Sequence, residues 1–299
     1  LGLCADYGGV AMAALLEVIR QRRARDLHVI CVPTGGLHVD MLIGAGLVAT
    51  LETSAVTLGE AGGAPRFIAG VRSGQFRLLD ATCPAILTGL LAAQKGVPFV
   101  PMRGLLGSDV LARRPDWKVI DNPFADAGGP DPIALIPALP LDVCVFHVPV
   151  ADRDGNVWIG RRRELASMAY AARRTLVTAE KIVDRSLLDD EQESAGVLPA
   201  LYVDALALAP GGTAPYGLWA FIEPDSKAIA DYARAARTQA RLCGSMTTVT
   251  PSASTTVSSG VISSSNAKST SGCPRPGVCA VRILSGLPGT PASHAMSWI

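Results

Sequence analysis

The segment that most constrains the fold is residues 141–160, in which an apolar run leads into a tight turn. Residues 143–146 form the run, and Pro140 and Pro149 bound it. This length and β-branched content are typical of a buried strand. Residues 152–156 are rich in Asp, Gly and Asn, which favour tight turns, and residues 157–159 are apolar again. We therefore predict a strand, a tight turn and a second strand.

Similar apolar runs alternate with helical patterns along the first 180 residues. The predicted strands are residues 1–5, 27–32, 50–58, 76–79, 98–100, 119–120, 175–179 and 198–208. The predicted helices are residues 11–25, 39–45, 66–73, 85–95, 161–174 and 225–236. Strand–helix alternation predicts an α/β protein with an open, mostly parallel sheet flanked by helices.

Composition narrows the classes of function. Hydrophobic residues make up 49% and charged residues 18%, which suits a sizeable core. The net charge of +1 gives no electrostatic case for binding nucleic acid or an anionic membrane. The sequence has neither an apolar run of spanning length nor a signal-peptide pattern. We expect a cytoplasmic protein without nucleic-acid or membrane partners.

The seven cysteines predict thiols rather than a metal centre. Cys4, Cys31, Cys83 and Cys144 occur in apolar or strand-like contexts, which suits reduced thiols in the cytoplasm. The sequence contains no Cys-x-x-Cys pair and no His pair at helical spacing, so no metal site is expected.

Two glycine-containing turns follow predicted strands and are candidate ligand sites. Gly8 and Gly9 lie between strand 1–5 and helix 11–25, where free N–H groups could bind an anion; a simple tight turn is the alternative. Glu60 follows strand 50–58. Ligands bind beyond the carboxyl ends of parallel strands, so Glu60 is a candidate for chemistry, with an exposed loop glutamate as the alternative.

A third candidate turn contains Asp80, Thr82 and Cys83 after strand 76–79. Thr82 is suited to cap helix 85–95. Cys83 beside a helix N-terminus is either a reactive thiol or a small buried residue. Residues 161–163 are three arginines, which suit either an anion such as a phosphate or a solvated helix face.

The loop 101–108 combines one cation with small residues. Arg103 could pair with a carboxylate or phosphate, and the neighbouring glycines allow close approach of a ligand. A structural turn with a surface arginine is the alternative. The loop's candidate substrate-binding residues are Arg103, Gly104, Gly107 and Ser108.

Several segments across residues 1–237 resemble, in order, the A subunits of family I coenzyme A transferases. They are VDMLIGAG (39–46), GVPFVPMRGLLGSD (96–109), DWKVIDNPF (116–124) and Ala-Asp-x-x-Gly-Asn (151–156), which follows His147. The resemblance is to glutaconate CoA-transferase A chains and to CoA-thioester hydrolases that open steroid rings. It implies a B-subunit partner, a heterotetramer, no permanently bound cofactor, and an acyl-CoA and a carboxylic acid as substrates.

The resemblance also implies that the nucleophile is a glutamate of the B subunit, in a Ser-Glu-Asn-Gly stretch that this chain lacks. Glu60 matches that stretch only in part. In the family, a glycine turn near the N-terminus belongs to a signature region, and the loop 101–108 borders the acyl and pantetheine end of the site. Gly8, Gly9, Asp80, Thr82, Cys83 and residues 103–108 are therefore expected to wall the site. A ring-opening hydrolase that uses Asp80, and a non-catalytic sensor of acyl-CoA or sugar phosphate, are the alternatives.

The composition changes after residue 240. Half of residues 241–270 are Ser or Thr, and no Asp or Glu follows Asp231. We predict a CoA-transferase A domain over residues 1–240, with upstream residues missing before Leu1. Residues 241–299 are predicted to form a disordered tail, or to be a non-native extension such as the product of a frame slip.

Overall fold

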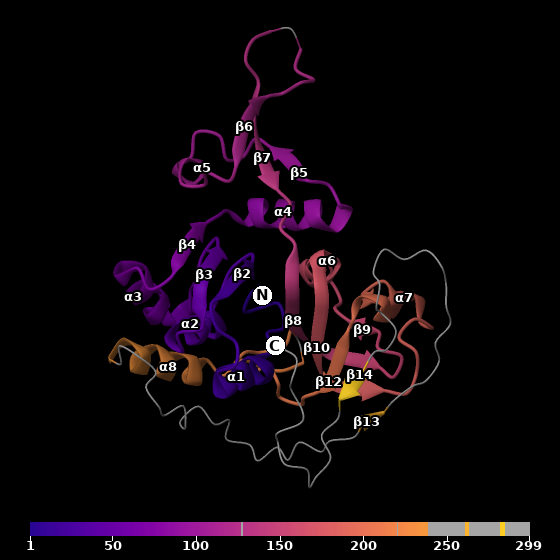
Figure 1. Cartoon of the computed structure of the whole chain (residues 1–299). Coiled ribbons are helices and arrows are strands. Elements are labelled where there is room, and N and C mark those ends of the chain that lie inside the picture. Colours follow the sequence, from indigo (N-terminus) through magenta and orange to yellow (C-terminus); the bar gives the residue numbers. More distant parts are fainter. Residues whose placement is uncertain (127, 220, 239–260, 263–281, 285–299) are drawn as a thin grey trace.

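The computed structural model describes residues 1–126, 128–219, 221–238, 261–262 and 282–284 (Figure 1). The prediction of a disordered tail falls almost entirely on residues outside these ranges. Within the tail, two short strands are described, β13 (Val261–Ile262) and β14 (Arg282–Leu284).

A large parallel sheet forms the centre of the molecule. Its strands are β1 (Gly2–Cys4), β2 (Leu27–Val32), β3 (Val48–Thr53), β4 (Arg77–Asp80), β8 (Leu141–Asp152), β10 (Ala172–Val183) and β12 (Ala205–Leu208). Their order is β12-β10-β8-β1-β2-β3-β4, and each neighbouring pair is parallel. The predicted open, mostly parallel α/β sheet is confirmed.

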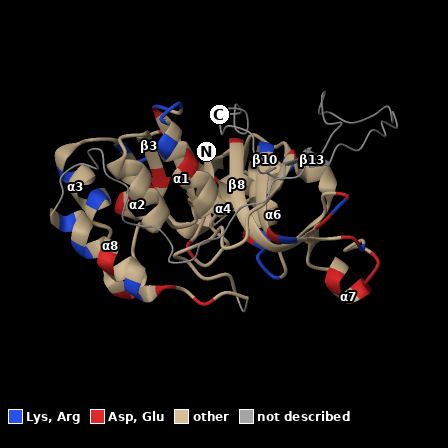
Figure 2. Cartoon of the chain, turned by 90° about the horizontal axis from the view of Figure 1, so that it is seen from below, with Lys and Arg blue, Asp and Glu red and all other residues tan. Residues whose placement is uncertain are grey.

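Helices cover the sheet. They are α1 (Met12–Gln21), α2 (Leu37–Gly44), α3 (Pro65–Ser73), α4 (Cys83–Lys95), α5 (Asp109–Ala112), α6 (Arg163–Ala171), α7 (Glu191–Ser194) and α8 (Ser226–Thr238), with 3₁₀ turns η1 (Gly59–Ala61) and η2 (Ala200–Tyr202). Helix α4 packs against α6, and α3 against α2 and α8. Charged residues gather on the peripheral helices and turns, and the central strands carry few (Figure 2).

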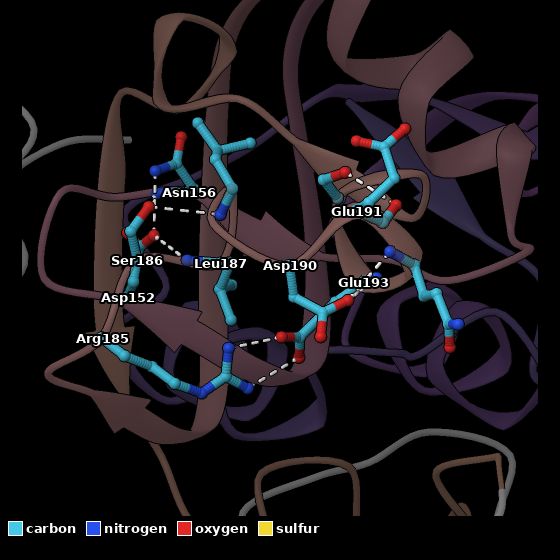
Figure 3. Close-up of polar contacts among 11 residues, drawn as sticks. Asp152, Asn156, Arg185, Ser186, Leu187, Asp190, Glu191 and Glu193 are labelled. Carbon is cyan, nitrogen blue, oxygen red and sulfur yellow. Dashed lines mark hydrogen bonds and ion pairs between the residues drawn. The ribbon is translucent and has the colours of Figure 1, made fainter.

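The segment 141–160 folds as predicted, into a hairpin of β8 and β9 (Val157–Trp158). A buried carboxylate holds its turn: Asp152 accepts hydrogen bonds from the backbone N–H and side-chain amide of Asn156, both at 2.9 Å, and from the Leu187 N–H at 3.0 Å (Figure 3). The Asn156 amide oxygen in turn accepts the Ala200 N–H at 2.9 Å. The Ala-Asp-x-x-Gly-Asn motif thus joins three segments of the chain through one buried polar cluster.

A separate antiparallel sheet contains β5 (Phe99–Met102), β6 (Lys118–Asp121) and β7 (Pro132–Pro137), in the order β5-β7-β6. It projects from the large sheet on the far side of α4 (Figure 1). Strand β7 leads into β8, so the small sheet is connected directly to the central strand.

Buried Arg114 ties the loop before β6 to the large sheet. Its guanidinium lies 2.8 Å from the carboxylates of Glu52 and Asp116, donates to the Asp80 carbonyl at 3.2 Å and stacks over the Trp117 ring at 4.1 Å. An open pocket of about 200 Å³ lies beside this cluster, and Glu52, Arg114, Asp116 and Trp117 are among its lining residues.

Several predicted boundaries were wrong. Helix 11–25 ends at Gln21, because Arg22 adopts a left-handed conformation. The predicted strand 50–58 ends at Thr53, whose hydroxyl donates to the Ala55 carbonyl and forms a local turn. Residues 198–208 are not one strand, because η2 separates β11 (Val197–Leu198) from β12.

Three further differences arise from local hydrogen bonding or pairing. The pattern gave no sign of α7, which Asp190 caps through the N–H groups of Gln192 and Glu193 (Figure 3). Predicted strand 175–179 is the middle of a longer β10, because pairing with β8 extends it in both directions. Predicted helix 161–174 ends at Ala171 for the same reason.

Among the residues that the structure describes, every helix is too short or too polar to cross a bilayer.

A buried carboxylate anchors the last described helix. Asp40 of α2 accepts the Tyr232 hydroxyl of α8 at 2.7 Å and the Phe67 N–H of α3, also at 2.7 Å. Burial raises the pKa of Asp40, and these two hydrogen bonds oppose the rise. Three helices from distant parts of the chain therefore meet at one side chain.

We predict that Tyr232→Phe lowers the free energy of unfolding by about 1–3 kcal/mol, because the buried Asp40 carboxylate loses a donor. Urea denaturation measures the change. Tyr202→Phe is the matched control, since the Tyr202 hydroxyl makes no hydrogen bond in the described chain, and it should stay within about 0.5 kcal/mol of the parent. Equal stability of both variants would contradict an anchoring role for Asp40.

Candidate functional site

The carboxyl edge of the large sheet brings the candidate turns to one side of the molecule. Because β1 to β4 are parallel neighbours, the residues that follow them share an edge. Gly8 and Gly9 follow β1, Ser54 follows β3, and Thr82 and Cys83 follow β4. The candidate turns after β1 and β4 therefore lie along this edge, with Ser54 between them in the strand order.

The turn after β1 requires glycine where it crosses β8. Gly9 has φ of +91°, and a Cβ atom there would lie 2.3 Å from the His147 carbonyl oxygen. The His147 N–H donates to the Gly9 carbonyl at 2.7 Å, and the Gly8 N–H donates to Ala5 at 2.8 Å. In the described chain, neither the Gly9 nor the Val10 N–H donates to another group. These two N–H groups, just before the start of α1, can donate hydrogen bonds to an oxyanion or a carbonyl oxygen.

The turn after β4 exposes a thiol. Thr82 caps α4 by accepting the Ala85 N–H at 3.3 Å, which confirms the predicted cap. The interpretation of Cys83 as a small buried residue was wrong, because the residue is exposed in the first turn of α4. Its sulfur lies 3.1 Å from the Ser54 hydroxyl, which donates to Pro33 at 2.9 Å. Sequence reasoning missed Ser54, because it lay inside the predicted strand 50–58.

Electrostatics place the turn after β1 near the turn after β4. Burial raises the pKa of Tyr7, and negative charge on Glu164, Asp6 and Cys83 raises it further. Glu164 lies in the first turn of α6, and Cys83 in the first turn of α4. Helices α4 and α6 pack together, so these two charged groups belong to neighbouring helices.

The remaining substrate-wall candidates lie in or near the small sheet. Arg103 forms an ion pair with Asp131, at 2.8 Å for one of its two contacts, and holds the pKa of that aspartate down at about 2, helped by Asn122. Ser108 caps the short α5 by accepting the Leu111 N–H at 3.4 Å. The Arg103 cation therefore already has a carboxylate partner, so a ligand would have to share or displace it.

The loop glycines and Asp80 have distinct environments. Gly107 has φ of +76°, whereas Gly104 does not need a left-handed conformation. Asp80 is the last residue of β4 rather than part of the following turn, and its carbonyl accepts Arg114.

Glu60 is exposed within η1, well beyond the end of β3. The neighbouring Ala61 carbonyl accepts Arg237 of α8 at 3.5 Å, so this turn packs against α8. No described contact connects Glu60 with Cys83 or with the turn after β1.

A buried polar cluster at the same edge was not predicted. His147 of β8 is fully buried; its Nδ1 lies 2.8 Å from the Thr178 hydroxyl and its Nε2 lies 2.8 Å from the Glu180 carboxylate. The other Glu180 oxygen accepts the Gly211 N–H at 2.8 Å. This network assigns the ring proton to Nε2, which donates to Glu180, while Nδ1 accepts from Thr178. A histidine inside an apolar strand was the available sequence signal.

The Glu180 carboxylate is stabilised in its charged form. Burial raises its pKa, but hydrogen bonds from His147 and Gly211 outweigh burial, so the pKa lies below its ordinary value. His147 is the titratable group that faces Glu180; the remaining donors are the N–H groups of Gly211 and Gly212.

Among the described residues, no cluster of three or more acidic, His or Cys side chains is arranged to hold a metal ion.

We predict that Cys83 is modified faster than the other three cysteines that the structure describes. Burial raises the pKa of Cys4 and raises that of Cys31 to about 12, which protects both thiols, and Cys144 is also buried. Maleimide labelling at pH 7.5 followed by peptide mapping should modify Cys83 at least about ten-fold faster than these three. Comparable labelling of Cys31 would contradict the described burial.

We also predict a pH signature for Glu180. Its pKa is lowered on folding, so its stabilisation is complete above the ordinary value of 4.5 and disappears as pH falls through the folded value. Glu180→Gln should cost about 1–2 kcal/mol at pH 7, since charge-assisted hydrogen bonds become neutral ones. Denaturation between pH 7 and 3 should show this deficit narrowing below about pH 4.5. A deficit that widens toward low pH would contradict the assignment.

Comparison with known proteins places these features in a family. The chain is 31% identical over 249 residues to the A-type subunit of glutaconate CoA-transferase from Acidaminococcus fermentans, covering 76% of this chain and 74% of that protein. It is 28% identical over 208 residues to the cholesterol ring-cleaving hydrolase IpdA subunit of Rhodococcus jostii, covering 67% and 69%. No family model matches the sequence.

Solved structures share the fold. A variant of the decarboxylase AibA/AibB aligns with a TM-score of 0.70 and 27% identity, over 80% of this chain and 88% of that one. Glutaconate CoA-transferase from Acidaminococcus fermentans aligns with a TM-score of 0.69 and 26% identity, over 79% of both chains. The sequence match, the parallel sheet and the glycine turns at its carboxyl edge lead to one assignment: this chain belongs to the family of the A subunits of family I coenzyme A transferases, with that of glutaconate CoA-transferase as a relative.

Proposed function

We propose that this chain is the A-type component of a two-subunit enzyme that moves CoA between an acyl-CoA thioester and a carboxylic acid. The observation that carries the proposal is the 31% identity, across three quarters of the chain, to the A-type subunit of glutaconate CoA-transferase. The two N–H groups without a described partner in the glycine turn, and the exposed Cys83 thiol beside Ser54, support a small-molecule site at the carboxyl edge.

The nucleophile in this proposal is a glutamate of the partner subunit. Its carboxylate attacks the thioester carbonyl, which gives an acyl-glutamyl anhydride and CoA thiolate. The thiolate then attacks the glutamyl carbonyl, forming a glutamyl-CoA thioester and releasing the first acid. An incoming carboxylate repeats these two steps in reverse and leaves as the new acyl-CoA. Covalent catalysis divides one difficult exchange into easier steps.

This chain's acidic residues at the edge are poorly suited to that role. Glu180 is held by His147 and Gly211, so its carboxylate is not free to attack a thioester. Glu60 is exposed and has no described contact with the glycine turn. We therefore infer that the chain is catalytically incomplete alone and that the enzyme is a hetero-oligomer, with a heterotetramer as the simplest assembly.

We assign the backbone N–H groups of Gly9 and Val10 as hydrogen-bond donors to the reacting carbonyl oxygen. These N–H groups donate to no other group in the described chain, and they lie just before the start of α1. In each addition step the carbonyl oxygen becomes an oxyanion, which such donors stabilise. Exposed Cys83 and Ser54 would then line the neighbouring wall. Arg103, Gly104, Gly107 and Ser108 remain candidates for contact with the rest of the substrate.

A hydrolase that opens a ring of a CoA thioester is the second candidate. The 28% identity to the ring-cleaving hydrolase IpdA favours it, and Asp80 is the acidic residue nearest the turn after β4 in sequence. Asp80 ends a strand and its carbonyl holds Arg114, which makes it part of the structural frame. A non-catalytic sensor of acyl-CoA or sugar phosphate is the third candidate.

We predict that the chain, co-expressed with a B-type subunit, exchanges labelled carboxylic acid into a panel of CoA thioesters. Hydroxylamine should trap the intermediate on the partner's glutamate, because anhydrides and glutamyl thioesters react with it. Glu60→Gln in this chain should leave the exchange rate within about two-fold of the parent, as expected for an exposed residue outside the site.

Other outcomes separate the alternatives. Trapping on Glu60 would overturn the assignment of the nucleophile to the partner. Ring opening without exchange, with CoA retained on the product, would select the hydrolase. Tight acyl-CoA binding with neither reaction would select the sensor.

A further inference from the structure

We propose that Glu180 and His147 form a positioning pair that holds two glycine turns at the carboxyl edge in one fixed arrangement. The inference rests on the proposed function, because the first of these turns is the one we assign to the thioester carbonyl. Neither side chain is placed in contact with substrate.

His147 contacts both turns directly. Its backbone N–H and carbonyl oxygen both face Gly9, the first as a hydrogen-bond donor at 2.7 Å and the second as the atom that a Cβ would strike. Its ring faces Gly212, where a Cβ would lie 2.9 Å from Cε1 and 3.0 Å from Nδ1. The two glycines therefore pack on the same residue.

Glu180 closes the connection from the other side. One of its carboxylate oxygens accepts a hydrogen bond from His147 Nε2 at 2.8 Å. The other accepts a hydrogen bond from the Gly211 N–H, also at 2.8 Å. The Gly212 carbonyl accepts the Ala13 N–H of α1 at 2.9 Å. The contacts run in a ring, from the turn after β1 through His147 and Glu180 to the turn after β12, and back to α1.

This closed circuit of contacts determines where the Gly9 and Val10 N–H groups point. Loss of the Glu180 carboxylate frees the Gly211 N–H and the His147 ring together. The turn after β12 then loses a direct constraint, and the turn after β1 rests on a His147 backbone whose side chain is no longer held. Small displacements of donors from a developing oxyanion reduce the rate more than they reduce substrate binding. A residue that only stabilised the fold would not couple the two turns.

Hydrogen–deuterium exchange on the full chain in complex with its B-type subunit tests the proposal. In Glu180→Ala, amides in residues 6–14 and 209–214 should both exchange at least about ten-fold faster, while residues 65–73 should be unchanged. Glu17→Ala, which removes a surface ion pair with Arg20 on α1, is the control and should alter neither segment.

Kinetics supply the second measurement. The kcat of Glu180→Ala, normalised to the folded fraction, should fall at least about ten-fold while KM for the acyl-CoA changes less than about three-fold. Glu180→Gln should recover part of the rate, because its amide oxygen still accepts the Gly211 N–H. Should Glu180→Ala fail to fold, Glu180→Gln takes its place in both measurements, with the same two segments affected to a smaller extent.

Two results would overturn the proposal. One is faster exchange confined to residues 209–214, which would show that Glu180 does not hold the turn after β1. The other is an unchanged normalised kcat together with faster exchange in both segments. If the parent complex shows no acyl exchange at all, the proposed function fails, and the deuterium measurement alone decides whether the pair couples the two turns.

Discussion

The contact between the Gly9 turn and the backbone of His147 is the constraint on which the rest of the site depends. It joins the first strand of the chain to the central strand β8, and only glycine fits because a Cβ would lie 2.3 Å from the carbonyl oxygen. The same crossing leaves the N–H groups of Gly9 and Val10 without partners in the described chain. The close packing of Gly9 on His147 thereby leaves two N–H groups available to a ligand. A ligand that accepts their hydrogen bonds gains binding free energy, because a buried donor without a partner is costly.

The central strand β8 is itself held at its middle and at its C-terminal end by buried polar groups. His147 connects it to β10 through Thr178 and Glu180, and Asp152 closes its hairpin through Asn156. Arg114 fixes the small sheet to β3 and β4 by its pair with Glu52. Each cluster is satisfied by several hydrogen bonds, which is what makes buried charge tolerable. The edge where the turns meet therefore rests on rigid elements.

The sequence was informative where local chemistry decides the outcome. The hairpin at 141–160, the Thr82 cap and the order of strands and helices followed from apolar periodicity and turn residues. The polar cluster around His147 could not be predicted, because Glu180 lies far along the chain and β10 was expected to end before it. Likewise, the exposure of Cys83 could not be decided from its neighbours, because it depends on how α4 packs. The long-range contacts that shape the site carry no local signal.

The central claim is that the carboxyl-edge turns bind the reacting end of an acyl-CoA. A crystal structure of the two-subunit complex with a slowly reacting acyl-CoA thioester tests it most directly. We expect the thioester oxygen within hydrogen-bond distance of the Gly9 and Val10 N–H groups, with Cys83 and Ser54 along the acyl chain. A thioester bound instead in the pocket beside Arg114 and Trp117, with the turn after β1 empty, would contradict it.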